Sequence, residues 1–345
     1  MKTKILLAFA SIALSMNSQN MKDFVINDAF DIKIFKTSPE AIAYINNIKG
    51  KEKLTVAIGP DCSQKDFETV CKLDWIERLQ IGKSYPNKTS VTDIKPIEAL
   101  KKLKKLAIYS QINKAANKAL DVTVISKLPQ LETLSISSNT VVNTKKLSTL
   151  INLNYLMLSG SGLSDVGFVT SFNKLTTLSL SGENNTFSNV AFLANFKLLE
   201  KLEIENNKVI TEENLKSIQG LTNLVEVSFN GCANVKNLDF LINNTKMEEL
   251  YADECGLNSI AGVLNMTDLV KLSLVKTKVT SLEALKEKRK LTTLEIQGLS
   301  IPDLSPLYNC VSLEKIYITS TITEQQQKEL QTKLPNIDIS IKDEE

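Results

Sequence analysis

The chain has 345 residues, with 41 Lys and Arg against 39 Asp and Glu, so its formal net charge at pH 7 is +2. A charge this close to zero gives no long-range attraction to nucleic acid or to an anionic membrane, and neither is predicted as a partner. The absence of histidine excludes Ser-His and Cys-His nucleophile pairs and the commonest metal ligand. Without a P-loop or a Gly-x-Gly-x-x-Gly motif, the sequence predicts no enzyme, no cofactor and no metal site.

The N-terminus has the layout of a secretory signal peptide, which we predict over residues 1–19. Lys2 and Lys4 precede an apolar run from Ile5 to Leu14, and small and polar residues follow. The alternative is an apolar N-terminal strand or helix. No other apolar run approaches the roughly 18 residues that span a bilayer. We therefore expect an exported protein that is secreted, periplasmic or at the cell surface, with no membrane span.

Residues 20–52 are predicted to form an N-terminal cap. The alternation of Phe30, Ile32 and Ile34 predicts a short strand. Ser38 is a suitable N-cap, Pro39 suits the first helical position and Gly50 suits the end of the helix. A strand followed by a helix would cover the first apolar edge of the rest of the chain.

Residues 53–322 repeat one short unit, shown best by Leu-Pro-Gln-Leu-Glu-Thr-Leu-Ser-Ile-Ser-Ser-Asn from Leu128 to Asn139. Leu134 and Ile136 would point inward from a strand, and Thr133, Ser135 and Ser137 outward. Equivalents of Ile136, which we call marker residues, recur every 21 to 28 residues at Ile58, Ile81, Ile108, Leu158, Leu180, Ile204, Phe229, Ala252, Leu274, Ile296, Ile318 and Ile339. Such a period predicts a solenoid of stacked strands.

The residue three places after the marker is small and polar in many repeats: Asn139, Asn207, Cys232, Cys255 and Thr277. We expect it to satisfy backbone groups where the strand turns away. The pattern resembles the leucine-rich repeat family. The segments Asp93–Ile97 and Asp303–Leu307 are similar to the back-side turns of 22-residue repeats in internalins and phosphatase regulators. This resemblance implies an α/β fold, a curved right-handed horseshoe with a parallel sheet on its concave face and short helical or 3-10 turns on its convex face.

Cysteine spacing leaves one disulfide open. Cys62 and Cys71 lie nine residues apart in the least regular repeat and could bridge the N-terminal end of the solenoid. Cys232, Cys255 and Cys310 occupy inward positions of the repeat and are predicted to be buried.

Two longer connections interrupt the period, at Lys83 to Thr92 and Gln111 to Val122. Insertions in solenoids emerge on one face and often contact partners. The alternative is a longer helix or loop on the back of the sheet.

The candidate binding residues form two groups on the outward side of the predicted strands. One is a section that we call the acidic section, built from Lys201, Glu203, Glu205, Glu226, Asn230, Glu249, Tyr251 and Asp253. Like charges on strands about 5 Å apart repel, which favours a surface kept for a cationic partner. The alternative is a solvated face balanced by Lys201 and Lys271, and no loop supports a calcium cage.

The second group is Tyr109, Tyr155 and Met157, among Ser and Thr residues. Exposed Tyr on a hydroxyl-rich surface is typical of protein-binding or sugar-stacking sites. One predicted strand separates Tyr109 from Tyr155, so the two rings could flank one groove.

Residues 323–345 are predicted to form a C-terminal cap and an acidic tail. Thr323 and Gln326 make a capping box for a helix from Glu324 to Lys333, and Ile337, Ile339 and Ile341 predict a final strand.

The sequence therefore predicts a non-catalytic extracellular scaffold that binds a macromolecule, most directly a protein, through the concave face. The internalin resemblance implies adhesion or host contact. The alternative is capture of a glycan or peptide at a bacterial surface.

Overall fold

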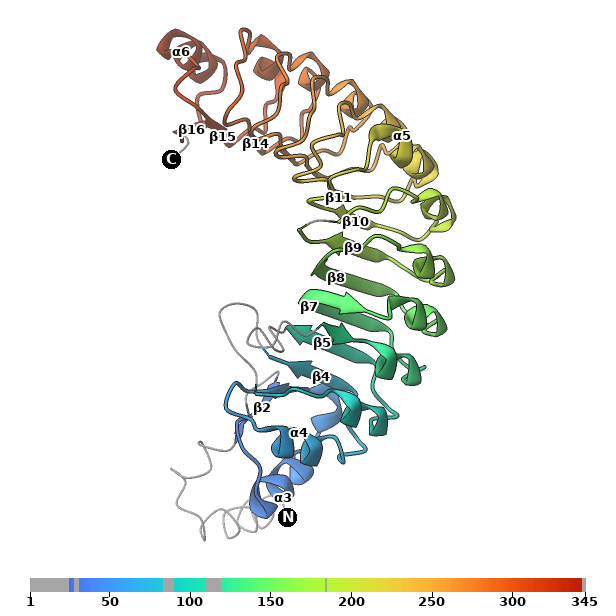
Figure 1. The fold of residues 1–345 in the computed structure, drawn as a ribbon. Helices are drawn as coiled ribbons and strands as arrows, with labels where there is room; N and C mark the ends of the chain where they lie inside the picture. The colour runs from blue at the N-terminus through green and yellow to red at the C-terminus, as the bar shows by residue number, and fades with distance from the viewer. Residues whose placement is uncertain (1–24, 28–30, 83–89, 110–118, 184, 343–345) are drawn as a thin grey trace. The chain divides into compact units, whose positions relative to one another are not determined.

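The computed structural model describes residues 25–27, 31–82, 90–109, 119–183 and 185–342. The predicted signal peptide and most of both predicted insertions, 83–89 and 111–118, lie outside the described residues. The chain divides into two compact units, residues 1–153 and 154–345. Each unit has one layer of strands and one layer of short turns (Figure 1). No helix in the described ranges is long and apolar enough to cross a membrane.

Among its described residues, the first unit contains seven strands and two α-helices. Its strands are β1 Val25–Asn27, β2 Asp31–Ile34, β3 Thr55–Ile58, β4 Arg78–Ile81, β5 Lys105–Tyr109, β6 Leu120–Asp121 and β7 Thr133–Val142. Its helices are α3 Pro39–Asn47 and α4 Gln64–Val70, with 3-10 turns η1 Lys51–Lys53, η2 Lys95–Ala99, η4 Thr123–Lys127 and η5 Thr144–Thr149. β1 pairs antiparallel with β2, and β2 to β5 and β7 form a parallel ladder, with β6 on the far end of β7.

The described part of the second unit contains nine parallel strands. They are β8 Tyr155–Ser161, β9 Thr177–Ser181, β10 Lys201–Ile204, β11 Glu226–Ser228, β12 Glu249–Tyr251, β13 Lys271–Ser273, β14 Thr293–Glu295, β15 Lys315–Ile318 and β16 Asp338–Ile341. Its helices are α5 Glu212–Leu215 and α6 Glu324–Lys333. The 3-10 turns are η6 Gly167–Ser171, η7 Ala191–Asn195, η8 Lys216–Gly220, η9 Asp239–Leu241, η10 Ala261–Val263, η11 Glu283–Leu285 and η12 Ser305–Asn309.

The strand registers confirm the repeat within each unit. In the first unit Ile58, Ile81, Ile108 and Ile136 are ladder partners in succession. In the second, Leu158, Leu180 and Ile204 follow the same rule. These residues are buried, and each such side chain contributes about 1.5–3 kcal/mol by leaving water. Parallel sheets with short turns between strands are the predicted fold class, which the structure confirms.

The last marker is wrong by two residues. Ile341, and not Ile339, pairs with Ile318, while Ile339 pairs with Ile316. The connection here is the ten-residue helix α6 rather than a short 3-10 turn, so the chain uses more residues before it re-enters the sheet.

Both terminal helices begin where the sequence predicts. The Ser38 side chain accepts from the Ala41 N–H at the start of α3. Thr323 and Gln326 form the predicted capping box of α6. Helix α4 was not predicted; it starts at a second capping box, Ser63 with Asp66. The pKa of Asp66 is lowered: burial opposes the shift, but hydrogen bonds from Ser63 and Thr37 outweigh it.

Cys62 and Cys71 are free thiols in the structure, so the bridge that their spacing allows is not formed. Helix α4 separates the two residues along the chain, and both are buried. The Cys62 thiol faces the Ser63 carbonyl at 3.9 Å. Burial raises the pKa of each thiol to about 12, so both behave as small apolar side chains. Cys232, Cys255 and Cys310 are also buried, as predicted.

The small polar residue after the marker satisfies backbone groups, as predicted. Asn207 is fully buried; its amide donates to the Phe187 carbonyl at 2.8 Å and accepts from the Val209 and Ile210 N–H groups at 3.0 and 2.9 Å. Cys232 and Thr277 make the corresponding contacts to backbone carbonyls at 3.1 and 2.8 Å. The turn after the strand is therefore held by side chains from within the repeat.

The middle outward position of the strands is more buried than the sequence predicts. Leu134 and Leu178 point inward and are buried, but the serines that alternate with them are also buried, at Ser135, Ser179, Ser228 and Ser273. The alternation along a strand predicts which way a side chain points, but it does not predict how buried that side chain is.

Candidate functional site

The candidate site lies on the strand face of the second unit, by which we mean the outward side chains of β8 to β15. The acidic section occupies this face on β10, β11 and β12. The parallel register aligns its side chains in rows that cross the strands. One row contains Lys201, Glu226, Glu249 and Lys271, and the next contains Glu203, Ser228, Tyr251, Ser273 and Glu295.

Lys201 and Glu226 are ladder partners and form an ion pair. The hydrogen bond to Glu226 raises the pKa of Lys201, although partial burial opposes the shift. The side chains remain accessible, with 48% of Lys201 and 24% of Glu226 exposed. This pair neutralises one edge of the acidic section.

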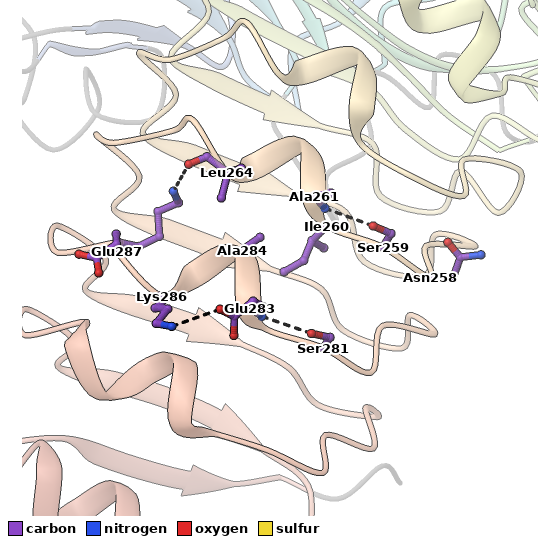
Figure 2. A pocket seen from close by; sticks show the side chains of 11 residues that line it. Asn258, Ser259, Ile260, Ala261, Leu264, Ser281, Glu283, Ala284, Lys286 and Glu287 are labelled. Carbon is purple, nitrogen blue, oxygen red and sulfur yellow. Dashed lines mark hydrogen bonds and ion pairs between the residues drawn. The ribbon is translucent and has the colours of Figure 1, made fainter.

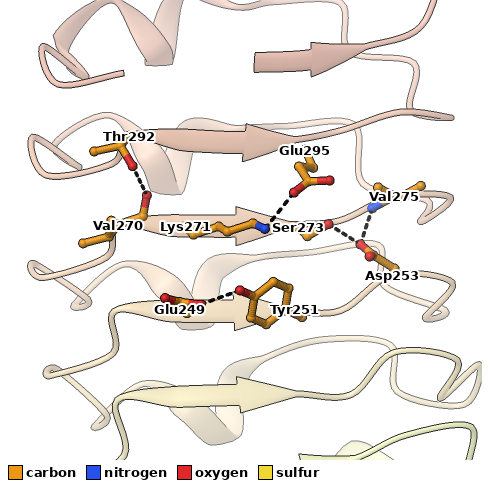
Figure 3. Close-up of polar contacts among 9 residues, drawn as sticks. All are labelled: Glu249, Tyr251, Asp253, Val270, Lys271, Ser273, Val275, Thr292 and Glu295. Atoms are coloured by element: carbon orange, nitrogen blue, oxygen red, sulfur yellow. Dashed lines mark hydrogen bonds and ion pairs between the residues drawn. The ribbon is translucent and has the colours of Figure 1, made fainter. Parts of the chain in front are cut away.

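Tyr251 lies at the centre of a second set of contacts, shown in Figure 3. Its hydroxyl donates to the Glu249 carboxylate on the same strand. The Lys271 ammonium lies 5.0 Å from the centroid of the Tyr251 ring and 3.0 Å from the Glu295 carboxylate. Burial first, and then the Glu249 carboxylate, raise the pKa of Tyr251. Three strands, β12 to β14, are thereby joined across the face.

Glu205 and Asp253 are held at the ends of their strands by hydrogen bonds. Glu205 accepts from the Ser228 hydroxyl at 2.5 Å, and Asp253 accepts from the Ser273 hydroxyl at 2.6 Å and from the Val275 N–H at 2.8 Å. Burial is the main cause that raises the pKa of both carboxyl groups, and the hydrogen bonds partly offset it. These two residues therefore organise the strand ends as well as contributing charge.

The acidic section is thus a network more than a set of repelling charges. The prediction that like charges lie together is correct in position, but most of the carboxylates have partners. Glu203 differs, because its carboxylate makes no ion pair or hydrogen bond with the described residues. Within the part of the chain that the structure describes, no group of His, Cys, Asp or Glu is arranged to hold a metal ion.

The second predicted group divides between the two units. Tyr109 ends β5 in the first unit, whereas Tyr155 and Met157 lie on β8 in the second, where the Tyr155 hydroxyl faces the Met157 sulfur at 3.9 Å. Each residue is half-buried. The predicted groove between the two rings stays a prediction.

Two features of this face escaped the sequence reasoning. Glu295 completes the Tyr251 network, and Tyr317 on β15 lies beneath two ammonium groups, from Lys315 at 5.6 Å and Lys342 at 4.3 Å. The register alone pairs Lys271 with Glu249, so its contacts with Tyr251 and Glu295 run diagonally between rows and depend on side-chain rotamers.

The turn side of the second unit carries a pocket of about 430 Å³ between η10 and η11 (Figure 2). Leu264, 60% exposed, lines it together with Glu283, Glu287 and Lys288. Lys288 occupies an inward position of the repeat, and its ammonium donates to the Leu264 carbonyl at 2.7 Å. Burial lowers the pKa of Lys288. This pocket, in which a lysine occupies a position that is apolar in most other repeats, was not predicted from the sequence.

Comparison with known proteins identifies solved structures that have a similar fold. No family model matches the sequence, and no curated protein matches it. Among solved structures, an internalin (inlF) of Listeria monocytogenes is 17% identical with a TM-score of 0.65, over 94% of this chain and 88% of that one.

Two further structures agree. Internalin C2 of Listeria monocytogenes is 22% identical with a TM-score of 0.51, over 56% of this chain and 83% of that one. The leucine-rich repeat ectodomain of an Arabidopsis thaliana membrane receptor kinase, solved in complex with Casparian strip integrity factor 2, is 14% identical with a TM-score of 0.53. It covers 89% of this chain and 43% of that one. The likenesses show that the chain has the leucine-rich repeat fold.

Proposed function

We propose that this chain is a non-catalytic scaffold that binds another protein through the strand face of its second unit. The observation that carries the proposal is the Tyr251 network. An accessible aromatic ring, a lysine and several carboxylates are fixed side by side on a hydrogen-bonded ladder. Tyrosine and charged groups on a rigid support suit protein recognition, because little side-chain entropy remains to be lost on binding.

The charge of this face indicates the kind of partner. Between β10 and β14 the carboxylates Glu203, Glu205, Glu226, Glu249, Asp253 and Glu295 outnumber the lysines Lys201 and Lys271. A partner with a basic surface would be complementary, and its association would weaken as salt rises. The receptor kinase ectodomain with the same fold was solved in complex with Casparian strip integrity factor 2, which supports a binding role for a chain of this fold.

The place of action in this proposal is outside the cytoplasm. Lys2, Lys4 and the apolar run that follows have the pattern of an export signal, and a basic extracellular protein is then the expected partner. Adhesion to, or contact with, a host is the form of this function that the internalin likeness favours.

The test is a binding screen of the mature chain against extracellular proteins and glycans. The strand-face variant carries Glu226→Lys and Tyr251→Ala. A matched control carries Glu287→Lys and Leu264→Ala, which make the same kinds of change on the turn side. Circular dichroism and thermal unfolding check that each variant is folded.

We expect a protein partner whose binding falls at least about tenfold in the strand-face variant and stays unchanged in the control. Equal binding by all three chains, or loss only in the control, would refute the proposal. Binding to glycans alone would replace it with the glycan alternative.

A further inference from the structure

We propose that Met157, Ser179 and Glu203 form a subsite for one cationic side chain, lysine or arginine, of the partner protein. This inference rests on the proposed function and names the chemistry that the strand face recognises. The three residues are ladder partners in sequence across β8, β9 and β10, with Met157 paired to Ser179 and Ser179 to Glu203. Adjacent strands lie about 4.8 Å apart, so the three side chains stand next to one another.

Ser179 provides the first observation. It is 2% exposed, and its hydroxyl has no hydrogen-bond partner among the described residues. The equivalent serines farther along the row have carboxylate partners: Ser228 donates to Glu205 and Ser273 donates to Asp253. Glu205 and Asp253 each lie just after the strand that precedes the one with their serine. The residue at the same repeat position before Ser179 is Ser159, which has no carboxylate. Leaving a buried hydroxyl without a partner is unfavourable, and a ligand that hydrogen-bonds to it would recover that loss.

Glu203 provides the second observation. Lys201, on the same strand, pairs with Glu226 on the far side, and the Glu203 carboxylate is left without an ion pair or hydrogen bond in the described part of the chain. Its side chain is half-buried, and Glu203 is the ladder partner of Ser179 on the adjacent strand. The carboxylate can only accept hydrogen bonds, and the hydroxyl, which can donate or accept, makes none among the described residues.

The chemistry of these groups selects a cation. Ammonium and guanidinium groups donate several hydrogen bonds and accept none, so one such group can satisfy both the Glu203 carboxylate and the Ser179 oxygen. Glu205 on the next outward position adds negative charge, which disfavours an anion. The Met157 side chain, with three rotatable bonds, can move aside and then pack against the aliphatic stem of the lysine or arginine.

The probes are fluorescein-labelled hexa-arginine and hexa-glutamate peptides, measured by fluorescence anisotropy with the mature chain at low salt. Glu203→Gln tests the subsite. Glu200→Gln is the matched control, since it removes the same charge from an exposed residue three positions earlier in the same repeat. Ser179→Ala tests the hydroxyl, and thermal unfolding confirms that each variant is folded.

We expect hexa-arginine to bind and hexa-glutamate not to bind. Glu203→Gln should weaken hexa-arginine binding about tenfold, Ser179→Ala about threefold and Glu200→Gln less than twofold. No binding of hexa-arginine, or equal losses in Glu203→Gln and Glu200→Gln, would overturn the subsite.

The two proposals fail separately. A screened protein partner that is lost in the strand-face variant but is indifferent to Glu203→Gln and Ser179→Ala would leave the binding scaffold standing and remove the subsite. Hexa-arginine binding that depends on Glu203, together with a partner indifferent to the strand-face variant, would keep the cation subsite and overturn the proposed use of the Tyr251 network.

Discussion

The Lys271 ammonium lies over the Tyr251 ring, 5.0 Å from its centroid, while it pairs with Glu295 at 3.0 Å on the opposite side. One cation thus joins an aromatic ring on β12 to a carboxylate on β14. About 0.5–1 kcal/mol is typical of each such contact when it is partly exposed. The main consequence is order: Tyr251 is held in one orientation on the strand face before any partner arrives.

The Tyr251 hydroxyl should ionise late. Burial and the Glu249 carboxylate raise its pKa, so its contribution to stability is complete below the ordinary tyrosine pKa of 10.0 and is lost as the pH rises above that value. We expect the phenolate absorbance of the native chain to show a late component that Tyr251→Phe removes. An unchanged titration curve in this variant would contradict the burial of the hydroxyl.

Glu205→Gln should stabilise the protein at pH 7. Burial raises the pKa of Glu205 in the folded state, so the charged form opposes folding, and stability falls as the pH rises from the unfolded pKa through the folded one. Glutamine keeps an oxygen that can accept the Ser228 hydrogen bond. Melting temperatures measured from pH 4 to pH 8 should show the advantage of the variant growing with pH. An advantage that is the same at all pH values would mean that the charge is not its cause.

Leu178→Ala and Ser179→Ala are neighbouring changes with opposite expectations. Leu178 is fully buried between stacked strands, and its truncation leaves a cavity that should cost about 2–5 kcal/mol of unfolding free energy. Ser179 is equally hidden, but its hydroxyl has no partner, so Ser179→Ala should be neutral or slightly stabilising. Denaturant unfolding followed by circular dichroism measures both. A loss above about 1 kcal/mol in Ser179→Ala would show that its hydroxyl is bonded in solution.

Asn207→Ala should be costly, since three backbone groups lose their side-chain partner, two of them in buried contacts and one in a part-buried contact. We expect a loss of at least about 2 kcal/mol in thermal or denaturant unfolding. Asn234→Ala is the control, because Asn234 is exposed and makes one bond, to the Lys208 carbonyl at 2.7 Å. Similar small losses at both positions would mean that Asn207 does not hold the turn.

The fold could be predicted well because each repeat has the same pattern of inward apolar residues and turn residues. The inward Leu134 and Ile136, the cap at Ser38 and the capping box at Thr323 depend on neighbouring residues alone. The last strand was predicted, but its marker residue was wrong by two positions, because the connection through α6 is longer than the one assumed from the repeat period. Helix α4 was missed because its capping box at Ser63 lies inside a segment where the repeat is least regular.

The candidate site could be predicted in position but not in its contacts. Register alone places Glu203, Glu226 and Tyr251 on neighbouring strands, and this was correct. Whether Lys201 turns toward Glu226 or toward Glu203 depends on side-chain rotamers, which the sequence pattern does not specify. The burial of Ser179 likewise depends on the rotamers of the side chains around it, which the sequence pattern does not specify.

Carbodiimide labelling of carboxylates, with and without the bound protein partner, tests the central claim most directly. Labelled residues are located by mass spectrometry, with Glu283 and Glu287 on the turn side as internal references. We expect binding to protect Glu203, Glu226 and Glu249, while Glu283 and Glu287 react as before. Protection of Glu283 and Glu287 with unchanged reaction of the other three would place the partner on the turns and rule out binding through the strand face.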